Sequence, residues 1–179
     1  MLLALITLAF IHFCALITPG PDFFLVSQTA ISRSRKDAML VVAGITAGVM
    51  FWACLALMGL NLIFEKMAWL KQGLLIAGGL YLCWLGYQML RSAFSKNEQE
   101  GNVAVELPKA PYLFFIKGLI TNLSNPKAVI YFGSVFSLFL ANPQLDQVHW
   151  LLFIIVTVET ILWFCFVTFI FSLPSFRAA

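Results

Sequence analysis

The sequence predicts an all-α integral membrane protein with five transmembrane helices, of which the first and the fourth are broken. Three observations predict this fold class. Of the 179 residues, 61% are hydrophobic and 11% are charged, against roughly 25% charged residues in soluble domains. The apolar residues form long unbroken runs, whereas membrane β-barrels show alternating segments of about ten residues. Proline interrupts two of these runs, as expected where a membrane helix breaks.

The first apolar segment, Leu2 to about Ile31, is broken by the pentapeptide Thr-Pro-Gly-Pro-Asp at positions 18–22. Its prolines end one helix, and Gly20 permits backbone dihedral angles that other residues resist. Such a break frees backbone groups inside the membrane, and the carboxylate of Asp22 can carry a proton or bind an amine. The stretch therefore predicts an ion or substrate site of a transporter. The alternative is a helix end that Asp22 caps at the membrane interface.

A short basic loop, residues 32–37, leads into a second segment that carries no charge from Ala38 to Phe64. As a helix, its 27 residues span about 40 Å, which is enough to cross a bilayer with tilt. The segment contains a GxxxG pattern at Gly44 and Gly48, which lets another helix approach closely. This pattern favours ordinary packing within the membrane, and dimerisation is the alternative.

A turn over residues 65–71 precedes the third segment, which ends near Leu90. Residues 92–111 are polar and contain prolines, and this change of composition predicts a cytoplasmic linker. The linker divides the chain into a first three-helix repeat, residues 1–91, and a second repeat, residues 112–179. Each repeat therefore opens with a broken segment.

The two breaks correspond to each other. The broken segment of the second repeat covers residues 112–141, and its Pro126-Lys127 parallels Pro21-Asp22 in the first. Three helices per repeat is an odd number, so the second repeat inserts upside down and an inverted repeat results. Corresponding broken helices in two such halves indicate a substrate site.

The basic residues of the loops predict the orientation in the membrane. Loops 32–37 and 91–117 contain three and four Lys or Arg residues, while loop 65–71 contains two and loop 141–148 contains none. The positive-inside rule places the first and third of these loops in the cytoplasm, with the N-terminus outside.

The last apolar segment, His149 to Leu173, contains one acidic residue, Glu159. Charged groups within membrane helices are costly and usually functional, so Glu159 is a candidate for proton coupling. The alternative is a protonated carboxylic acid that only packs.

Several functions are excluded by what the sequence lacks. A net charge of +3, with the basic residues in short loops between apolar runs, does not indicate binding to nucleic acid. The two histidines lie on separate segments and no HExxH or DxxxD-like cluster occurs, so we expect no enzymatic activity and no metal or other cofactor. We interpret His12 as a packing residue, because a lone histidine on an apolar helix usually has that role.

Three stretches carry a resemblance to a known family: TPGPDFFLVSQTAISRSRKDAM, GITAGVMFWACLALMGL and KGLITNLSNPKAVIYFGSVFSLF. Together they resemble the LysE/RhtB family of amino-acid exporters, and the match covers nearly the whole chain. The resemblance implies a multi-pass transporter of the bacterial inner membrane that exports threonine, homoserine and related small amino acids by antiport with protons. Its partners would be the amino acid, protons and the lipid bilayer, with a homo-oligomer left open. Residue by residue, it points to Pro19, Gly20, Pro21, Asp22, Asn122, Asn125, Pro126 and Lys127.

A zwitterionic substrate needs an acceptor for its ammonium group and donors for its carboxylate. Asp22 can supply the first, and Lys127, or the amides freed at a broken helix, can supply the second. The neutral groups of Gln28, Asn122 and Asn125 are candidates for binding a side-chain hydroxyl. The alternative is that Asp22 and Lys127 form a structural ion pair that joins the two repeats.

The C-terminal end departs from the family pattern. Relatives of this type usually have a further apolar helix after the Ser-Leu-Pro that stands here at residues 172–174. From this difference we expect a second repeat that lacks its third helix, and weak export by a chain of this length. The alternative function is accordingly an inactive remnant or a membrane assembly partner that transports nothing itself.

Overall fold

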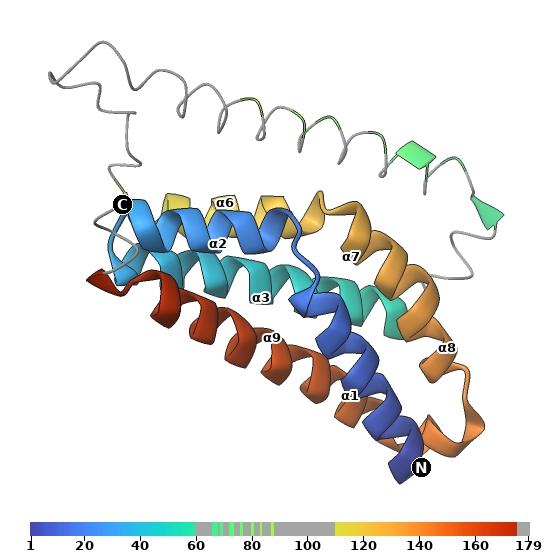
Figure 1. The fold of residues 1–179 in the computed structure, drawn as a ribbon. Helices are drawn as coiled ribbons and strands as arrows, with labels where there is room; N and C mark the ends of the chain where they lie inside the picture. The colour runs from blue at the N-terminus through green and yellow to red at the C-terminus, as the bar shows by residue number, and fades with distance from the viewer. Residues whose placement is uncertain are drawn as a thin grey trace, which may run out of the picture.

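The computed structural model describes residues 1–59 and 110–174, together with positions 66, 67, 69, 72, 73, 76, 80, 83 and 87. Every regular element in this part of the chain is a helix (Figure 1), which confirms the all-α fold class. The predictions for the third segment and for the linker up to residue 109 lie outside the described residues.

The first broken segment forms two helices, α1 (Leu2–Ile17) and α2 (Pro21–Ser32), which meet at an angle of 57°. Pro21 occupies the first turn of α2, where its missing N–H costs nothing. The reason given above for Gly20 is wrong, because its backbone is extended, with φ −157° and ψ −175°. The missing side chain matters for space instead: a Cβ atom there would lie 3.2 Å from the Lys127 Nζ, so the lysine side chain would have to shift slightly.

Helix α3 (Arg35–Leu57) begins earlier than the sequence pattern predicted, so the basic loop shrinks to two residues. The reason is a capping box: the Ser34 side chain accepts from the Asp37 N–H while the Asp37 carboxylate accepts from the Ser34 N–H. The helix also ends before the predicted Phe64. Gly59, with φ 90°, follows its last turn, and this left-handed conformation is the usual glycine stop signal.

The second broken segment forms α6 (Tyr112–Leu123) and α7 (Pro126–Ile130), and the chain continues through the π-helix η2 (Tyr131–Phe136) into α8 (Ser137–Leu140). As in the first break, a proline begins the helix that follows. The π-helical turn was not predicted. Directly after it, the hydroxyl of Ser137, the first residue of α8, donates to the carbonyl of Phe132 in η2 at 2.9 Å.

Glycines bring α3 and α6 into backbone contact. A Cβ atom at Gly44 would collide with the carbonyl oxygen of Phe115, and one at Gly118 would collide with that of Val41. Gly48 lies against the side chain of Asn122. The GxxxG pattern thus packs against a helix of the same chain, as the sequence analysis favoured. This close approach places Asn122 beside α3.

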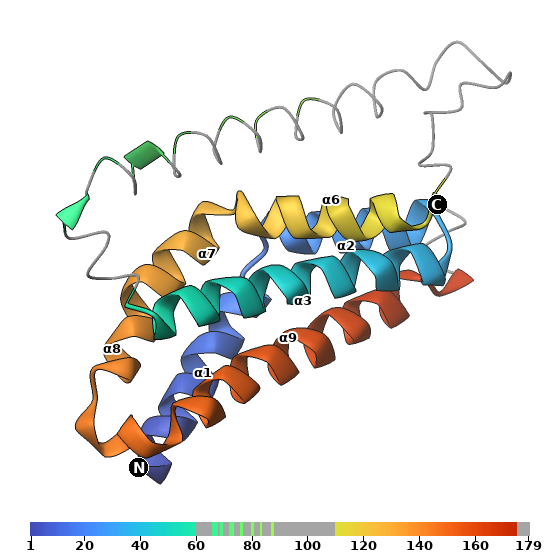
Figure 2. The ribbon, with the colours of Figure 1, turned by 180° about the vertical axis from the view of Figure 1, so that it is seen from behind.

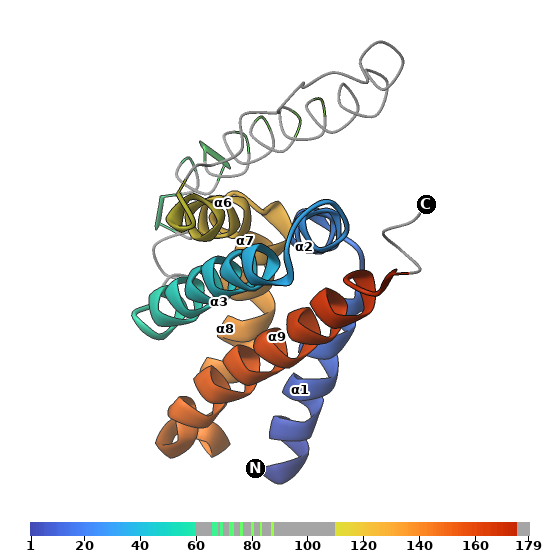
Figure 3. The ribbon, with the colours of Figure 1, turned by 90° about the vertical axis from the view of Figure 1, so that its left-hand side faces the viewer.

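Helix α9 (His149–Phe171) follows the short 3-10 helix η3 (Pro143–Val148) and completes the described fold. Figure 3 shows α3 between α6 and α9, with α2 beside them. The two broken segments run in opposite directions: α1–α2 leads away from the end of the molecule that α7–α8 approaches (Figures 1 and 2).

The two ends of the helix bundle are defined by contacts. The N-terminal amine of Met1 donates to the Gln144 side chain at 3.3 Å, so the N-terminus and η3 share one end. At the other end, the Arg35 guanidinium lies 5.2 Å from the centre of the Phe169 ring. The loop that is rich in arginine therefore lies at the opposite end from the N-terminus.

Helix lengths agree with a membrane protein. Residues Arg35–Leu57 and Pro143–Phe171 form helices long and apolar enough to cross a membrane, and the bent pair α1–α2 makes a third span if it crosses as one unit. Residues Tyr112–Leu123 and Pro126–Leu140 form shorter apolar helices. Large apolar side chains such as Leu3, Leu138 and Leu162 lie on the outer surface, where lipid tails can cover them.

Candidate functional site

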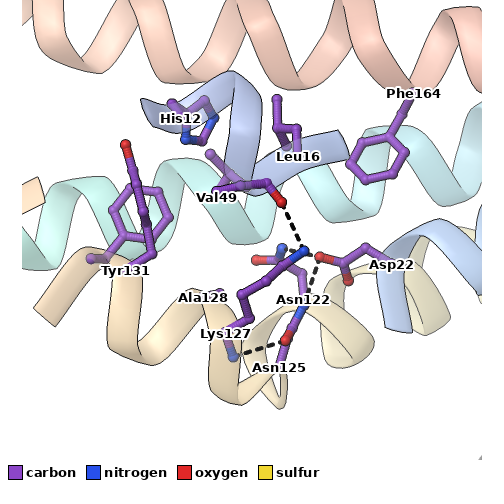
Figure 4. Close-up of a pocket in the computed structure, with 12 residues that line it drawn as sticks. His12, Leu16, Asp22, Val49, Asn122, Asn125, Lys127, Ala128, Tyr131 and Phe164 are labelled. Carbon is purple, nitrogen blue, oxygen red and sulfur yellow. Dashed lines mark hydrogen bonds between the residues drawn. The ribbon is translucent and has the colours of Figure 1, made fainter. Parts of the chain in front are cut away.

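The two helix breaks meet inside the molecule, although about one hundred residues separate them. Asp22, at the start of α2, is buried and its Oδ2 accepts hydrogen bonds from two amides of the second break (Figure 4). The Asn122 Nδ2 donates at 2.9 Å and the Asn125 Nδ2 donates at 3.0 Å. The two asparagines therefore hold one oxygen of this buried carboxyl group in a fixed position between the two breaks.

Asn125 has a second role at the same time. Its Oδ1 accepts from the backbone N–H of Lys127 at 3.0 Å, so it is the N-cap of α7. The residue therefore fixes where α7 begins while its amide group faces Asp22. An asparagine directly before Pro126 can therefore cap α7 with its oxygen and donate to Asp22 with its nitrogen.

Lys127 binds the other side of the first break. Its Nζ donates to the carbonyl oxygens of Ala15 at 2.9 Å and Thr18 at 2.8 Å, at the C-terminal end of α1. These carbonyls lack intrahelical partners because the helix stops there, and the negative end of the helix dipole favours a cation. The absence of a side chain at Gly20 leaves room for the ammonium group.

Asp22 and Lys127 do not form a direct ion pair. In residues 1–59 and 110–174, the ion pair that the structure contains joins Asp146 to His149 at 4.0 Å. The charges of Asp22 and Lys127 interact at longer range, while each group is satisfied by neutral partners. The structural ion pair considered in the sequence analysis is therefore not what joins the two breaks.

A small cavity opens between these groups. Its volume is about 40 Å³, which is room for a few water molecules, and it is below the 300–1,000 Å³ of typical ligand pockets. The residues that line it come from α1, α2, α3, the second break, η2 and α9: His12, Ala15, Leu16, Asp22, Val49, Asn122, Asn125, Lys127, Ala128, Tyr131, Phe132 and Phe164.

Several polar atoms around this cavity are buried and have no hydrogen-bond partner in the described part of the chain. They are Asp22 Oδ1, Asn122 Oδ1, His12 Nδ1 and the Tyr131 hydroxyl oxygen. A buried polar atom without a partner costs free energy, and such atoms in native structures indicate bound water, a ligand or a functional role. Four of them on the wall of one cavity indicate a site for a polar molecule.

The predicted site residues divide into two groups. Asp22, Asn122, Asn125 and Lys127 line the cavity together. Pro19, Gly20, Pro21 and Pro126 belong to the breaks and shape them without lining the cavity. Gln28 and Glu159 lie outside the cavity; Glu159 is on α9 and has one buried oxygen that lacks a partner.

His12 and Tyr131 were not predicted as site residues, yet both line the cavity. Their ring centres are 5.0 Å apart, and the His12 Nε2 lies 3.4 Å from the Thr160 hydroxyl of α9. Helical spacing could have indicated both. Tyr131 lies four residues after Lys127 along one helix, and His12 lies three residues before Ala15, so each shares a helix face with a site residue.

Comparison with known proteins agrees with the resemblance drawn from the motifs. Residues 13–179 match the family described as LysE type translocator. The chain is 55% identical over 178 residues to the threonine efflux protein of Escherichia coli K12, covering 99% of this chain and 86% of that protein. The threonine efflux protein of Salmonella typhi is 54% identical with the same coverage.

A more distant relative widens the comparison. The chain is 27% identical over 162 residues to a leucine efflux protein of Klebsiella pneumoniae, covering 90% of this chain and 74% of that protein. No solved structure matches the chain. The extent of the family match, together with the identity to the two threonine efflux proteins, shows that this chain belongs to the LysE family of translocators.

Proposed function

We propose that this protein exports threonine, homoserine and related small amino acids across the bacterial inner membrane, and that the substrate binds where the two helix breaks meet. The observation that carries the proposal is the environment of Asp22. It is a buried carboxylate within an apolar bundle, held through one oxygen by two asparagines, with its other oxygen unpartnered at a cavity. Acidic groups in such positions mark substrate or ion pathways.

The ammonium group of the substrate is the natural partner of this end of the cavity. Both Asp22 Oδ1 and Asn122 Oδ1 are acceptors without partners, and an ammonium group offers three donors. The hydrogen bonds to Asn122 and Asn125 hold the Asp22 side chain in place before the substrate arrives. The binding geometry is thus set in advance, which lowers the ordering cost of binding.

The substrate carboxylate requires a donor, and Lys127 is the cation that lines the same cavity. Its Nζ is engaged with the Ala15 and Thr18 carbonyls, so it must exchange a carbonyl for the carboxylate when the substrate binds. Such an exchange weakens the contact between the end of α1 and the start of α7. Substrate binding would then favour a conformation in which these helices separate.

The small size of the cavity implies that transport involves a second conformation with a wider cavity. A volume of about 40 Å³ does not admit an amino acid, so transport requires a state in which the cavity is wider. The opposite directions of the two broken segments, together with the matching prolines, support the inverted-repeat architecture with residues 1–91 and 112–179 as its halves. Movement of one half against the other would open the site to alternate sides.

Protons supply the driving force in this proposal. Asp22 lies at the substrate site, and Glu159 lies on α9 with a buried unpartnered oxygen. Both are carboxyl groups within membrane helices, and such groups serve as proton relays in transporters. We assign direct competition between proton and substrate to Asp22, and a coupling role outside the cavity to Glu159.

The experiment that tests this function measures threonine efflux from liposomes that contain the purified protein. Vesicles that contain the protein and are loaded with radiolabelled threonine should lose it faster than protein-free vesicles loaded in the same way when the proton gradient is directed into the vesicles. Collapse of that gradient should slow the loss. Efflux no faster than that from protein-free vesicles, with correctly inserted protein, would refute the proposal.

A further inference from the structure

The cavity has two chemically different ends. Asp22, Asn122 and Asn125 lie at one end, while His12 and Tyr131 lie together at the other (Figure 4). The first end carries the carboxyl group of Asp22 and the amides of the two asparagines, which suit the charged groups of a zwitterion. The second end offers an imidazole and a phenol, whose hydrogen-bonding atoms suit a neutral partner.

The second end has unmet hydrogen-bonding capacity. The Tyr131 hydroxyl and His12 Nδ1 are both buried, with residue exposures of 7% and 3%, and neither has a partner among the described residues. The ring of His12 is oriented by the contact between its Nε2 and the Thr160 hydroxyl, at 3.4 Å. Glu159 interacts electrostatically with Tyr131, but no hydrogen bond joins them. The two unmet atoms therefore remain available to a molecule in the cavity.

Much of the remaining lining of the cavity is apolar, and it includes Leu16, Val49, Phe132 and Phe164. A hydrophobic wall of this kind accepts a small side chain but discriminates poorly between a methyl group and a hydroxyl of the same size. Hydrogen-bonding groups at the end of such a wall discriminate well, because an analogue without the hydroxyl leaves them unpaired.

We propose that His12 and Tyr131 are specificity-determining residues, which bind the hydroxyl group of the substrate side chain and so select hydroxylated amino acids over their apolar isosteres. A hydroxyl both donates and accepts, so it can pair with the Tyr131 phenol and with His12 Nδ1 at once. The inference rests on the proposed function, since it assigns the opposite end of the same cavity. The sequence analysis assigned the hydroxyl of the substrate to Asn122 and Asn125 among other residues. Their amide groups donate to Asp22 in the structure, so we assign the hydroxyl to His12 and Tyr131 instead.

The test compares threonine with valine, which has a methyl group in place of the hydroxyl. Displacement of radiolabelled threonine from the purified protein gives the affinity for each amino acid. Tyr131→Phe removes the hydroxyl and keeps the aromatic contacts with Phe132 and Phe136. We expect it to lower the threonine-over-valine preference roughly 3- to 10-fold, through weaker threonine binding and unchanged or tighter valine binding.

Tyr112→Phe is the matched control. Tyr112 is exposed at the start of α6, so this substitution removes a phenolic hydroxyl outside the cavity. A second variant, Thr160→Val, removes the group that orients His12 and should lower the preference in the same direction. An unchanged preference in Tyr131→Phe, or an equal effect of Tyr112→Phe, would overturn the assignment. So would a wild-type protein that binds threonine and valine equally.

The same assay separates this inference from the proposed function. Asp22→Asn should weaken threonine and valine alike, because both amino acids carry the ammonium group. If Asp22→Asn has that effect while Tyr131→Phe leaves the preference unchanged, only the assignment of His12 and Tyr131 fails. If the protein binds neither amino acid, or if Asp22→Asn changes neither affinity, the substrate site itself is wrong and both proposals fail.

Discussion

The ammonium group of Lys127 donates to the carbonyl of Thr18 at 2.8 Å, although 109 positions separate the two residues in the chain. The contact joins the start of α7 to the end of α1, and it uses a lysine for a task that membrane proteins with broken helices can give to a bound cation. The positively charged Lys127 side chain therefore stabilises the first break through its hydrogen bonds to the carbonyls there.

Removal of the charge of Asp22 should stop export without unfolding the protein. In Asp22→Asn the new amide oxygen can still accept from Asn122 and Asn125, so the packing is retained. The ammonium group of the substrate loses a charge-assisted hydrogen bond, which corresponds to about 10- to 100-fold weaker binding. Efflux from loaded vesicles and the amount of inserted protein should be measured together. Normal efflux by this variant would remove Asp22 from the mechanism.

Exchange of the two charges should fail to restore function. If Asp22 and Lys127 were only an ion pair, the double variant Asp22→Lys with Lys127→Asp would recover the export lost in each single variant. In the structure a carboxylate at position 127 would face the carbonyls of Ala15 and Thr18 and repel them. We therefore expect the double variant to be as inactive as Lys127→Met. Recovery of efflux in the double variant would contradict this account of the two residues.

Glu159 should affect coupling more than binding, because it does not line the cavity. We expect Glu159→Gln to retain threonine affinity within about 2-fold, since a group outside the site contributes little to binding. Its efflux should no longer respond to an imposed proton gradient. Asp146→Asn is the control, because this acidic residue is exposed in η3. A gradient response equal to that of the wild type would assign Glu159 to packing alone.

The contact between α3 and α6 should be sensitive to a single methyl group. Gly44→Ala places a Cβ atom against the Phe115 carbonyl, so the two backbones must separate. The expected cost is about 1–3 kcal/mol of stability, as for overpacked cores. Thermal unfolding in detergent measures this cost. Gly73→Ala is the matched control, because a methyl group there meets nothing within 4 Å apart from its local backbone. Equal melting temperatures for the two variants would show that the close contact is unimportant.

The orientation in the membrane can be tested at two described positions. Ser34 lies in the arginine-rich turn near the end of α9, whereas Gln144 lies beside the N-terminus. The positive-inside rule predicts that Ser34 faces the cytoplasm and Gln144 faces the outside. Reporter fusions that are active on only one side should therefore give opposite signals at these positions. The same signal at both would rule out the predicted topology.

The sequence by itself determined the helical membrane fold, the positions of both breaks and the family. These features follow from local properties: the length of an apolar run, the missing N–H of a proline and the order of residues in two short motifs. Asp22, Asn122, Asn125 and Lys127 could be named because charged and amide groups stand out in apolar sequence. The helix starts at Pro21 and Pro126 were likewise predictable from the chain alone.

Only the tertiary structure decided which of these groups meet. Asp22 pairs with two asparagines and Lys127 with two carbonyls, over separations of 100 to 112 residues. Such pairings depend on how closely the helices pack, and glycines at the α3–α6 contact set that distance. His12 and Tyr131 joined the site for the same reason. Their hydrophobic surroundings in the sequence resemble those of packing residues, and only the convergence of α1, η2 and α9 exposes their polar atoms to one cavity.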